Sequence, residues 1–437
     1  MKKKIKIGTV CLTRNTFDFG AAAGLYKDIL SELQKRDDIE LVAYEDIIME
    51  SDEAQKVGRF FSENIVDAYC VISGTFHLGH LVLEIKKICD KPMLLWGLPE
   101  LPYDGGKIRL NSVCGVNLNA SNLVKSGISD FTYSVSSVID EKWLDAVRMV
   151  VALKTAHIGI IGYRAHGFFN VGVDELSLYG KFGCIVDHFE LSELWNSPTT
   201  EEDIEHYKQK AKENFDCSNL TEEKLEQVAS LCSKFKNFMQ SNSLTVLAVR
   251  CWPEFAAGFG IAPCASMSIL QSEGFLLSCE GDIDCAITML CHKAIGAQTP
   301  FMADLSQANL EENTALMWHC GVAPCNLADG ICCSSLDSYH AGGRGVTAGF
   351  VMKSGKVSMA RLDSMAGKYR LFMETGEAVP MEKLLSGTYA KVKFDKEIKD
   401  VLDKVIYSGV AHHVSLVYDD YSEIFKIFAR LKGVEIL

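Results

Sequence analysis

The sequence lacks several features that would place it at once in a familiar class of protein. No apolar run approaches the roughly 18 residues that a membrane-spanning helix needs. Lysine and arginine number 44 against 57 aspartate and glutamate residues, a formal net charge of −13, and the basic residues form no stripe or tail. This charge pattern argues against a nucleic acid or an anionic membrane as the partner. A small molecule is the expected ligand.

The sixteen cysteines form neither a disulfide framework nor a zinc-binding pattern. Several lie inside apolar segments, as Cys184 does, where a reduced cysteine behaves as a small hydrophobic residue. The closest pairs, Cys320 with Cys325 and Cys332 with Cys333, lack the paired two-residue spacing of a zinc knuckle. The opening segment, MKKKIKIGTVCLTRN, fits a first strand better than a signal peptide. We therefore expect a cytoplasmic protein.

The order of apolar and amphipathic segments predicts three domains. Over 1–153, short apolar runs such as IKIGTVCL alternate with amphipathic segments, which is typical of βαβ units on a parallel sheet. The alternation restarts at HIGIIGYRAHGF and predicts a second α/β domain over 154–305. Over 306–437, period-two segments with Ser-Gly and Thr-Gly turns predict antiparallel hairpins. The predicted fold class is α/β, with two Rossmann-like parallel-sheet domains followed by a β-rich, barrel-like domain.

Two carboxylates follow apolar runs in the predicted central domain. Glu280 in CEGD and Asp304 in FMAD each end a segment that we expect to be a strand of the parallel sheet, with a helix-like segment between them. Taken singly, each carboxylate is explained as a cap of the next helix. Ligands of such sheets gather beyond the carboxyl ends of the strands, however, so the two side chains are also candidates for a common site.

Three histidines extend this candidate site. His319 in WHCG ends another apolar run, and the adjacent His412 and His413 open a C-terminal strand. Two carboxylates and an imidazole suit a divalent cation that keeps coordination positions open for a hydroxylated substrate, and favour manganese or magnesium over structural zinc. Neighbouring residues of a strand face opposite sides, so at most one of His412 and His413 should reach the metal. Each histidine taken alone also fits a satisfied core or loop position.

The order of these residues resembles the L-fucose isomerase and L-arabinose isomerase superfamily of aldose–ketose isomerases. The resemblance covers most of the chain. The separation of Glu280 and Asp304, and their order as Glu then Asp, matches the fucose isomerase branch, whereas the HH pair and the terminal GVEIL resemble the arabinose branch. The chain is shorter than typical members of either branch. We therefore expect a compact member of the fucose isomerase-like branch.

The resemblance implies a divalent metal held by Glu280, Asp304 and His413. Manganese is the usual metal of the superfamily, with Mg²⁺ and Co²⁺ as alternatives. The two carboxylates would also serve as the acid/base pair that moves a proton through a cis-enediol, whose developing charge the metal stabilises. His319 matches a metal ligand of the arabinose branch only, so a metal ligand and a substrate contact both stay open for it. His412 is open in the same way.

The resemblance further implies a homo-oligomer, a hexamer or a trimer, with active sites at subunit interfaces. Its N-terminal domain would close the site of a neighbouring subunit, which makes Arg14 and His77 candidates for contacts across the interface. In the segment RCWPEF, Arg250, Trp252 and Glu254 are further candidates for binding substrate. Simpler explanations exist for all of them, as surface charges, a satisfied loop histidine or a core aromatic.

The substrate and the reaction class leave alternatives. The candidate sugars are L-fucose or D-arabinose, L-arabinose, and a C6-modified hexose such as sulfoquinovose. A sulfonate would require a cationic pocket, for which Arg14, Arg250 and Arg344 are the candidates. A non-catalytic sugar-binding or regulatory protein, and a metal-dependent epimerase or aldolase on the same scaffold, are the competing hypotheses.

Overall fold

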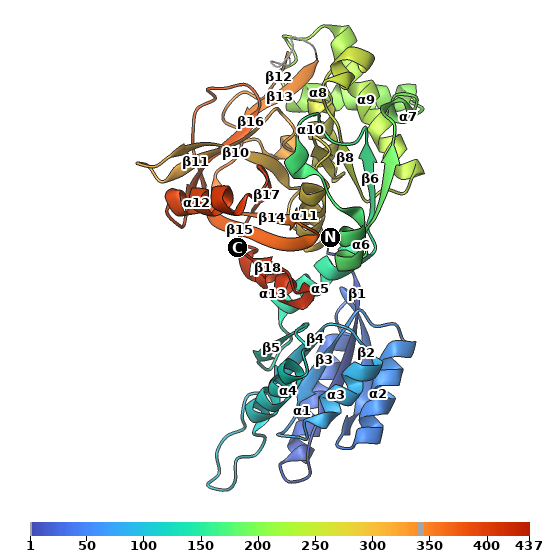
Figure 1. Cartoon of the computed structure of the whole chain (residues 1–437), viewed down its shortest axis with the longest axis vertical. Coiled ribbons are helices and arrows are strands. Elements are labelled where there is room, and N and C mark those ends of the chain that lie inside the picture. The colour runs from blue at the N-terminus through green and yellow to red at the C-terminus, as the bar shows by residue number, and fades with distance from the viewer. Residues whose placement is uncertain (1, 339–344) are drawn as a thin grey trace. The chain divides into compact units, whose positions relative to one another are not determined.

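The computed structural model describes residues 2–338 and 345–437, and its contacts separate two units. One unit comprises Met1–Val151 with Glu423–Val434, and the larger one Ala152–Ser422 with Glu435–Leu437. The predicted fold class is confirmed, because each unit contains a parallel sheet and the larger unit adds a nine-stranded mixed sheet (Figure 1). In the part of the chain that the structure describes, no helix is long and apolar enough to cross a membrane. The boundaries of the three expected domains stay a prediction.

The N-terminal unit is a parallel sheet in the order β2-β1-β3-β4-β5, covered by helices. Val10 of β1 belongs to the apolar cluster on the face of the sheet that α2, α3 and α4 cover. Because successive strand residues face opposite sides, the neighbouring Thr9 points to the other face. There the hydroxyl of Tyr26 in α1 donates to the Thr9 carbonyl (3.1 Å). The elements are β1 (Ile5–Leu12), α1 (Phe19–Gln34), β2 (Ile39–Ile48), α2 (Ser51–Glu63), β3 (Ala68–Ser73), α3 (His80–Ile88), β4 (Met93–Gly97), α4 (Ser112–Lys125), β5 (Phe131–Val135) and α5 (Glu141–Lys154).

The last helix of the chain, α13 (Ser422–Lys432), belongs to the N-terminal unit. The Arg430 Nε–H donates to the Phe131 carbonyl (2.7 Å), and its guanidinium lies over the Phe131 ring, 5.1 Å from the centroid. The amphipathic pattern of this segment predicts a helix, but no local pattern identifies the element on which the helix packs. The chain therefore returns to its first unit before it ends.

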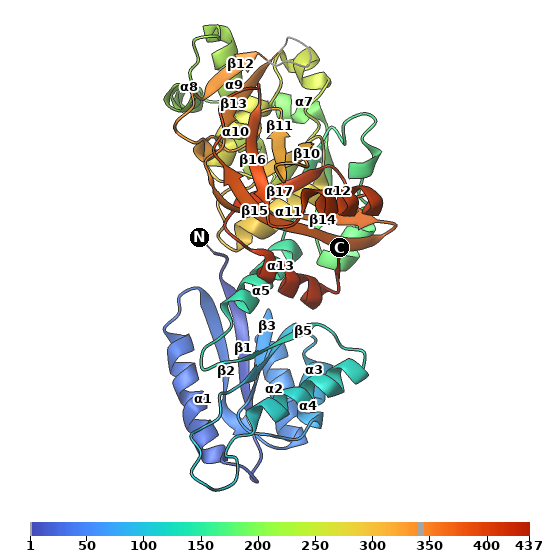
Figure 2. The ribbon, with the colours of Figure 1, turned by 90° about the vertical axis from the view of Figure 1, so that its left-hand side faces the viewer.

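The larger unit begins with a parallel sheet in the order β7-β6-β8-β9, flanked by long polar helices (Figure 2). Thr200 and Thr221 start two of these helices, since their side chains accept hydrogen bonds from the backbone N–H groups of Asp203 and Lys224. The elements are β6 (His157–Ile161), α6 (Glu175–Phe182), β7 (Ile185–Phe189), α7 (Leu191–Trp195), α8 (Glu201–Asn214), α9 (Glu222–Ser241), β8 (Val246–Val249), α10 (Cys264–Ser272), β9 (Leu277–Cys279) and α11 (Ile283–Ala294).

The second sheet of this unit has the order β12-β13-β16-β11-β10-β17-β14-β15-β18, and β15 also pairs with β16. That extra pairing closes the strands from β16 to β15 into a ring, as the predicted barrel-like domain requires. The elements are β10 (Phe301–Asn309), β11 (Thr314–His319), β12 (Ser335–Ser338), β13 (Val346–Val351), β14 (Gly355–Met365), β15 (Lys368–Val379), β16 (Thr388–Phe394), α12 (Ile398–Ser408), β17 (His413–Tyr418) and β18 (Glu435–Ile436).

Two details of the predicted strands are wrong. Asp304 does not end a strand of the parallel sheet, because β10 continues to Asn309 and pairs antiparallel with β11 and β17. The apolar run stops at Asp304 because burial stops there, while the strand itself goes on with exposed polar residues. The chain also does not turn at Gly376, as the Thr-Gly pair had predicted, because this residue lies inside β15. Glycine is needed there for close packing, since a Cβ atom on residue 376 would come within 2.4 Å of the Lys393 carbonyl oxygen on β16.

Helix α11 lies between the two sheets of the larger unit. It packs against β8 and β9 and also against β14 and β17. Eleven of its twelve residues are buried, so it is covered on all sides, as its nearly continuous apolar sequence requires. The helix thereby holds the end of the parallel sheet beside the strands of the barrel.

A buried ion-pair network joins the start of α11 to the barrel. Arg361 of β14 is fully buried, and its Nη1 lies 2.7 Å from Asp282 Oδ2 while its Nε lies 2.9 Å from Asp363 Oδ1. Asp363 also binds Arg370, at 2.7 Å. The Arg361 Nη1–H additionally donates to the His413 carbonyl, at 3.1 Å. One guanidinium therefore fixes three separate chain segments.

We predict that Arg361→Met destabilises the larger unit by about 3–5 kcal/mol, because it removes the guanidinium that binds the fully buried carboxylate of Asp282. Lys391→Met on β16 is the matched control, since Lys391 and its partner Glu312 are 34% and 53% exposed. It should cost less than about 1 kcal/mol. Urea unfolding followed by circular dichroism and tryptophan fluorescence measures both values. Equal losses for the two variants would contradict this account.

Candidate metal centre

Glu280 lies in the tight turn between β9 and α11. Glu280 and Gly281 both have left-handed backbones, with φ of 62° and 75°. The simple explanation of Glu280 as a helix cap is wrong, because Asp282 caps α11 and accepts a hydrogen bond from the Cys285 N–H (2.9 Å). The Ala165 N–H donates to the Glu280 carbonyl (3.0 Å). The loop after β6 therefore supports this turn, and the Glu280 carboxylate is available to the site.

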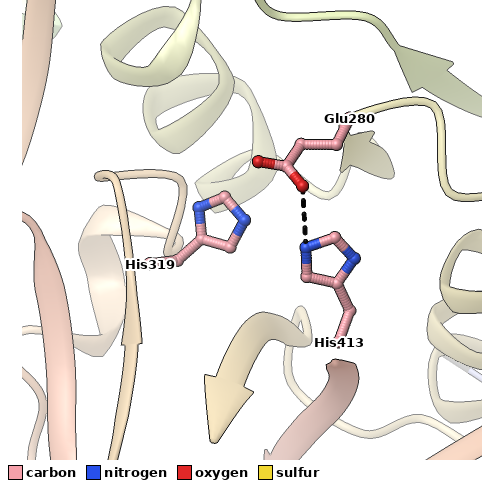
Figure 3. Close-up of side chains that lie close together, drawn as sticks. All are labelled: Glu280, His319 and His413. Carbon is pink, nitrogen blue, oxygen red and sulfur yellow. Dashed lines mark ion pairs between the residues drawn. The ribbon is translucent and has the colours of Figure 1, made fainter. Parts of the chain in front are cut away.

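Four elements bring the predicted site residues together. Glu280 comes from the turn after β9, Asp304 from β10, His319 from the end of β11 and His413 from the start of β17. Figure 3 shows Glu280, His319 and His413 facing one space, with the closest contact, 3.3 Å, between His413 Nε2 and Glu280 Oε2. Asp304 is the direct cross-strand partner of His413, and its Oδ1 lies 3.5 Å from the same Nε2. The expected clustering of both carboxylates with the histidines is thus present in the fold.

Each of these side chains directs a buried polar atom at that space without a hydrogen-bond partner among the described residues. The atoms are Glu280 Oε2, Asp304 Oδ1, His319 Nε2 and His413 Nε2. Buried polar atoms are nearly always hydrogen-bonded, so four that converge indicate a ligand. Glu280, His319 and His413 offer donor atoms within 4.8 Å of one another, as do Asp304, His412 and His413. The donor set and its unmet hydrogen bonds fit a divalent cation.

Asp282 orients His413. The His413 Nδ1–H donates to Asp282 Oδ2 (2.9 Å), and that carboxylate is itself held by Arg361 (2.7 Å). Because Asp282 holds the proton on Nδ1, the proton that a cation displaces from His413 is the one on Nε2, and the resulting lone pair is directed at Glu280 and Asp304. A carboxylate behind a histidine is the usual outer partner of a metal-ligating imidazole.

The site is strongly charged. Burial opposes ionisation of Glu280, but the His412 and His413 rings outweigh it and hold the pKa of Glu280 well below its usual range. Burial likewise opposes ionisation of Asp282, and Arg361 with His413 lowers its pKa. Burial disfavours charged His413, but the hydrogen bond to Asp282 and the Glu280 carboxylate raise its pKa to about 9. For His319, burial lowers the pKa.

His412 lies at the rim of the site. Its Nε2 is 3.5 Å from Glu280 Oε2, and its Nδ1 lies 3.1 Å from the Asn170 amide nitrogen. The alternation expected for a strand does not separate the two histidines, because β17 begins at His413 and His412 precedes it. Both rings therefore approach Glu280, and the choice of His413 as the ligand stays a prediction.

The weaker candidates are spread more widely. The ring of Trp252 contacts Phe168 (5.7 Å between centroids), which contacts His412 (5.4 Å), so Trp252 lies near the rim. Arg250 is paired with Glu254, at 3.1 Å. Arg344 lies outside the described residues.

The two candidates for contacts across an interface lie in the N-terminal unit. The Arg14 N–H donates to the Thr75 hydroxyl (2.9 Å). His77 is fully buried, with Nε2 3.1 Å from the Ser73 hydroxyl, and burial lowers its pKa to about 4. His77 thus has the environment of a satisfied core histidine, and the interface roles of both residues stay predictions.

Sequence reasoning missed two residues that support the site. Asp282 stands only two positions after Glu280, and a second carboxylate so close to the first was a signal in the segment CEGDID. Arg361 interrupts an apolar, strand-like segment, VSMARLDS, which indicates a buried charge that needs a partner. That partner lies on a distant element, so only the fold identifies it as Asp282.

Known sulfoquinovose isomerases are similar to this chain. Those of Priestia aryabhattai and Priestia megaterium are each 28% identical to it, over 98% of this chain and 97% of the relative. A sulfoquinovose isomerase of Alkalicoccus urumqiensis is 26% identical, over 85% of this chain and 86% of the relative. No model of a known protein family matches the chain.

Similarity to solved structures is weak. A periplasmic solute binding protein of an ABC transporter from Actinobacillus succinogenes, with bound D-allose, is 11% identical over 66% of this chain and 91% of that protein. The TM-score is 0.17, which is too low to support any argument about the fold or the function.

The raised pKa of His413 predicts a pH-dependent stability of the chelator-treated protein. Protonated His413 stabilises the fold fully below its ordinary pKa of 6.5, and this contribution disappears as the pH rises through about 9. Between roughly pH 6 and pH 10, wild type should lose about 3 kcal/mol relative to His413→Gln. Urea unfolding at several pH values in the presence of a chelator measures the difference. Parallel pH profiles of the two proteins would refute this role of His413.

Proposed function

We propose that this chain is a metal-dependent aldose–ketose isomerase that acts on a free sugar. The observation that carries the proposal is the convergence of unpartnered buried atoms of Glu280, Asp304 and His413 on one space. Relatives that cover almost the whole chain are sulfoquinovose isomerases, which confirms the prediction of an aldose–ketose isomerase. Membership of the fucose isomerase-like branch stays a prediction.

Glu280, Asp304 and His413 are the residues that would hold the metal. Two carboxylate oxygens and one imidazole nitrogen make an oxygen-rich set, which supports Mn²⁺, with Mg²⁺ and Co²⁺ as alternatives. When bound, such a cation polarises a carbonyl and stabilises the negative charge that develops on it. Asp282 would keep the lone pair of His413 directed at the site through its 2.9 Å hydrogen bond.

The two carboxylates would also move the proton. Isomerisation of the open-chain sugar moves one proton from C2 to C1 and a second from O2 to O1 through a cis-enediol, so a carboxylate must take the proton from one carbon and return it to the next. The side chain of Glu280 is 11% exposed and that of Asp304 is 24% exposed. The more exposed Asp304 is suited to exchange protons with solvent, while Glu280 acts deeper in the site.

Sulfoquinovose is the substrate that we favour, because the relatives that align over most of the chain carry this name. Its anionic sulfonate requires a cation in the pocket, and Arg250, two residues before Trp252, is the sequence-predicted candidate in the same unit as the carboxylates. The proposal includes a cytoplasmic homo-oligomer, a hexamer or trimer, whose sites are completed by the N-terminal unit of a neighbour.

The test is turnover of a sugar panel by chelator-stripped protein. Sulfoquinovose, L-fucose, D-arabinose and L-arabinose are each incubated in deuterated water with and without Mn²⁺, and ketose formation is followed by NMR. We expect ketose from sulfoquinovose only with added metal, and a loss of at least about 100-fold for Glu280→Gln. Glu312→Gln, which alters a half-exposed carboxylate paired with Lys391, is the control and should keep metal-dependent turnover.

Several outcomes would contradict the proposal. Binding of a sugar without any turnover would favour a non-catalytic sugar-binding protein. Deuterium incorporation at C2 without ketose would favour an epimerase. Full activity of Glu280→Gln would show that the assigned site is wrong.

Asp282→Asn should weaken metal binding by about 10–100-fold without removing any proposed ligand, because an amide no longer fixes the proton of His413 on Nδ1. Isothermal titration with Mn²⁺ measures the affinity. Asp284→Asn is the matched control, since Asp284 is also buried at the start of α11 but is bound by Ser364 and Tyr369 instead of His413. Equal affinities of wild type and Asp282→Asn would refute the orienting role.

A further inference from the structure

We infer that His319 is a hydrogen-bond donor to the sugar and is not a metal ligand. The inference rests on the proposed function for the identity of the ligand as a sugar. The assignment of the donor itself rests on the hydrogen bonds around the ring.

The backbone decides the protonation of His319. The Cys320 N–H donates to His319 Nδ1 at 2.8 Å. A peptide N–H has no lone pair and can only donate, so Nδ1 must be the unprotonated nitrogen of the ring. An imidazolium has no free lone pair, so the ring is neutral and its single proton is on Nε2. A nitrogen that carries this proton cannot bind a metal ion.

The resulting Nε2–H faces the site without an acceptor among the described residues. His319 is 1% exposed, and its Nε2 is buried and makes no hydrogen bond. In Figure 3 one ring nitrogen of His319 points toward the space between Glu280 and His413. A buried donor in this position requires an oxygen atom from a molecule that enters the site.

The ring of His319 is held in place. The Cys320 N–H fixes its Nδ1 (2.8 Å), and the ring is nearly parallel to that of Trp318, with centroids 6.4 Å apart and planes at 11°. The Trp318 indole N–H donates to the Ser386 carbonyl (2.8 Å), and the Thr347 hydroxyl donates to the Cys320 carbonyl. The donor is therefore positioned before substrate arrives, which is the condition under which a hydrogen bond stabilises charge that develops during a reaction.

His413 shows the opposite arrangement. Its Nδ1–H is bound by Asp282 (2.9 Å), so Nε2 is the nitrogen that offers a lone pair once a cation has displaced the second proton of the ring. The two rings lie 5.5 Å apart, so one presents a lone pair and the other an N–H to the same space. A cation is attracted by the lone pair and repelled by the N–H, while a carbonyl or hydroxyl oxygen of a sugar accepts from the N–H. The difference separates a metal-binding side of the site from a sugar-binding side.

Metal titration of variants tests the assignment. Calorimetry with Mn²⁺ alone should give His319→Leu an affinity within about 3-fold of wild type, whereas the matched His413→Leu should lose at least about 100-fold. A loss for His319→Leu as large as that for His413→Leu would overturn the inference. Circular dichroism of both variants verifies that each is folded before the comparison is made.

Nitrogen-15 NMR of the histidine rings, on protein loaded with diamagnetic Mg²⁺, gives a readout that needs no turnover. His319 should show a protonated Nε2 and His413 a protonated Nδ1. The His319 Nε2–H resonance should shift when sulfoquinovose or a sugar alcohol such as L-fucitol is added. A protonated Nδ1 on His319, or an unchanged resonance with every sugar, would overturn the inference.

Turnover provides the third readout. The kcat/KM of His319→Leu should fall by about 100-fold, and His319→Gln, whose amide keeps an N–H donor, should recover most of that loss. Wild-type kcat/KM for His319→Leu would overturn the inference. Failure of wild type to convert any sugar would instead contradict the proposed function, and the metal titration and NMR would still decide the role of His319.

Discussion

The buried carboxylate of Asp282 connects the parts of the larger unit on which the site depends. Its Oδ1 caps α11 through the Cys285 N–H, and its Oδ2 binds both Arg361 and His413. Helix, barrel strand and site histidine thus share one carboxylate in a fully buried environment, where electrostatic interactions are strong and unpaired charges are costly. The geometry of the site follows from this shared ion pair.

The carboxylates on the two sides of His413 differ in whether they have partners. Behind His413, every carboxylate of the network has a partner, because Arg361 and Arg370 neutralise Asp282 and Asp363. In front of it, Glu280 and Asp304 keep oxygen atoms without hydrogen-bond partners in the described part of the chain. The oxygen atoms that lack hydrogen-bond partners therefore lie on the side of His413 where we place the ligand.

The chemical groups of the site could be predicted from the sequence, but some of their positions could not. Polar residues at the ends of apolar runs indicate Glu280, Asp304, His319 and the pair His412 and His413, and the family resemblance selects His413 from that pair. Asp304 was predicted to end its strand, but the apolar run stops there only because burial stops, and the strand continues to Asn309. Asp304 nevertheless lies directly opposite His413, so the residue was correct although its predicted position was wrong. Arg361 was missed because its partner lies on an element distant in sequence.

The sequence by itself determined the α/β fold class, the alternation of strands and helices and the donor atoms available for a cation, because periodicity and side-chain chemistry are local properties. Only the tertiary structure decided which atoms of those side chains are free to act. His319 and His413 are chemically identical residues, and they differ because a backbone N–H reaches one ring and a carboxylate reaches the other. The position of a proton on an imidazole is set by its neighbours in space.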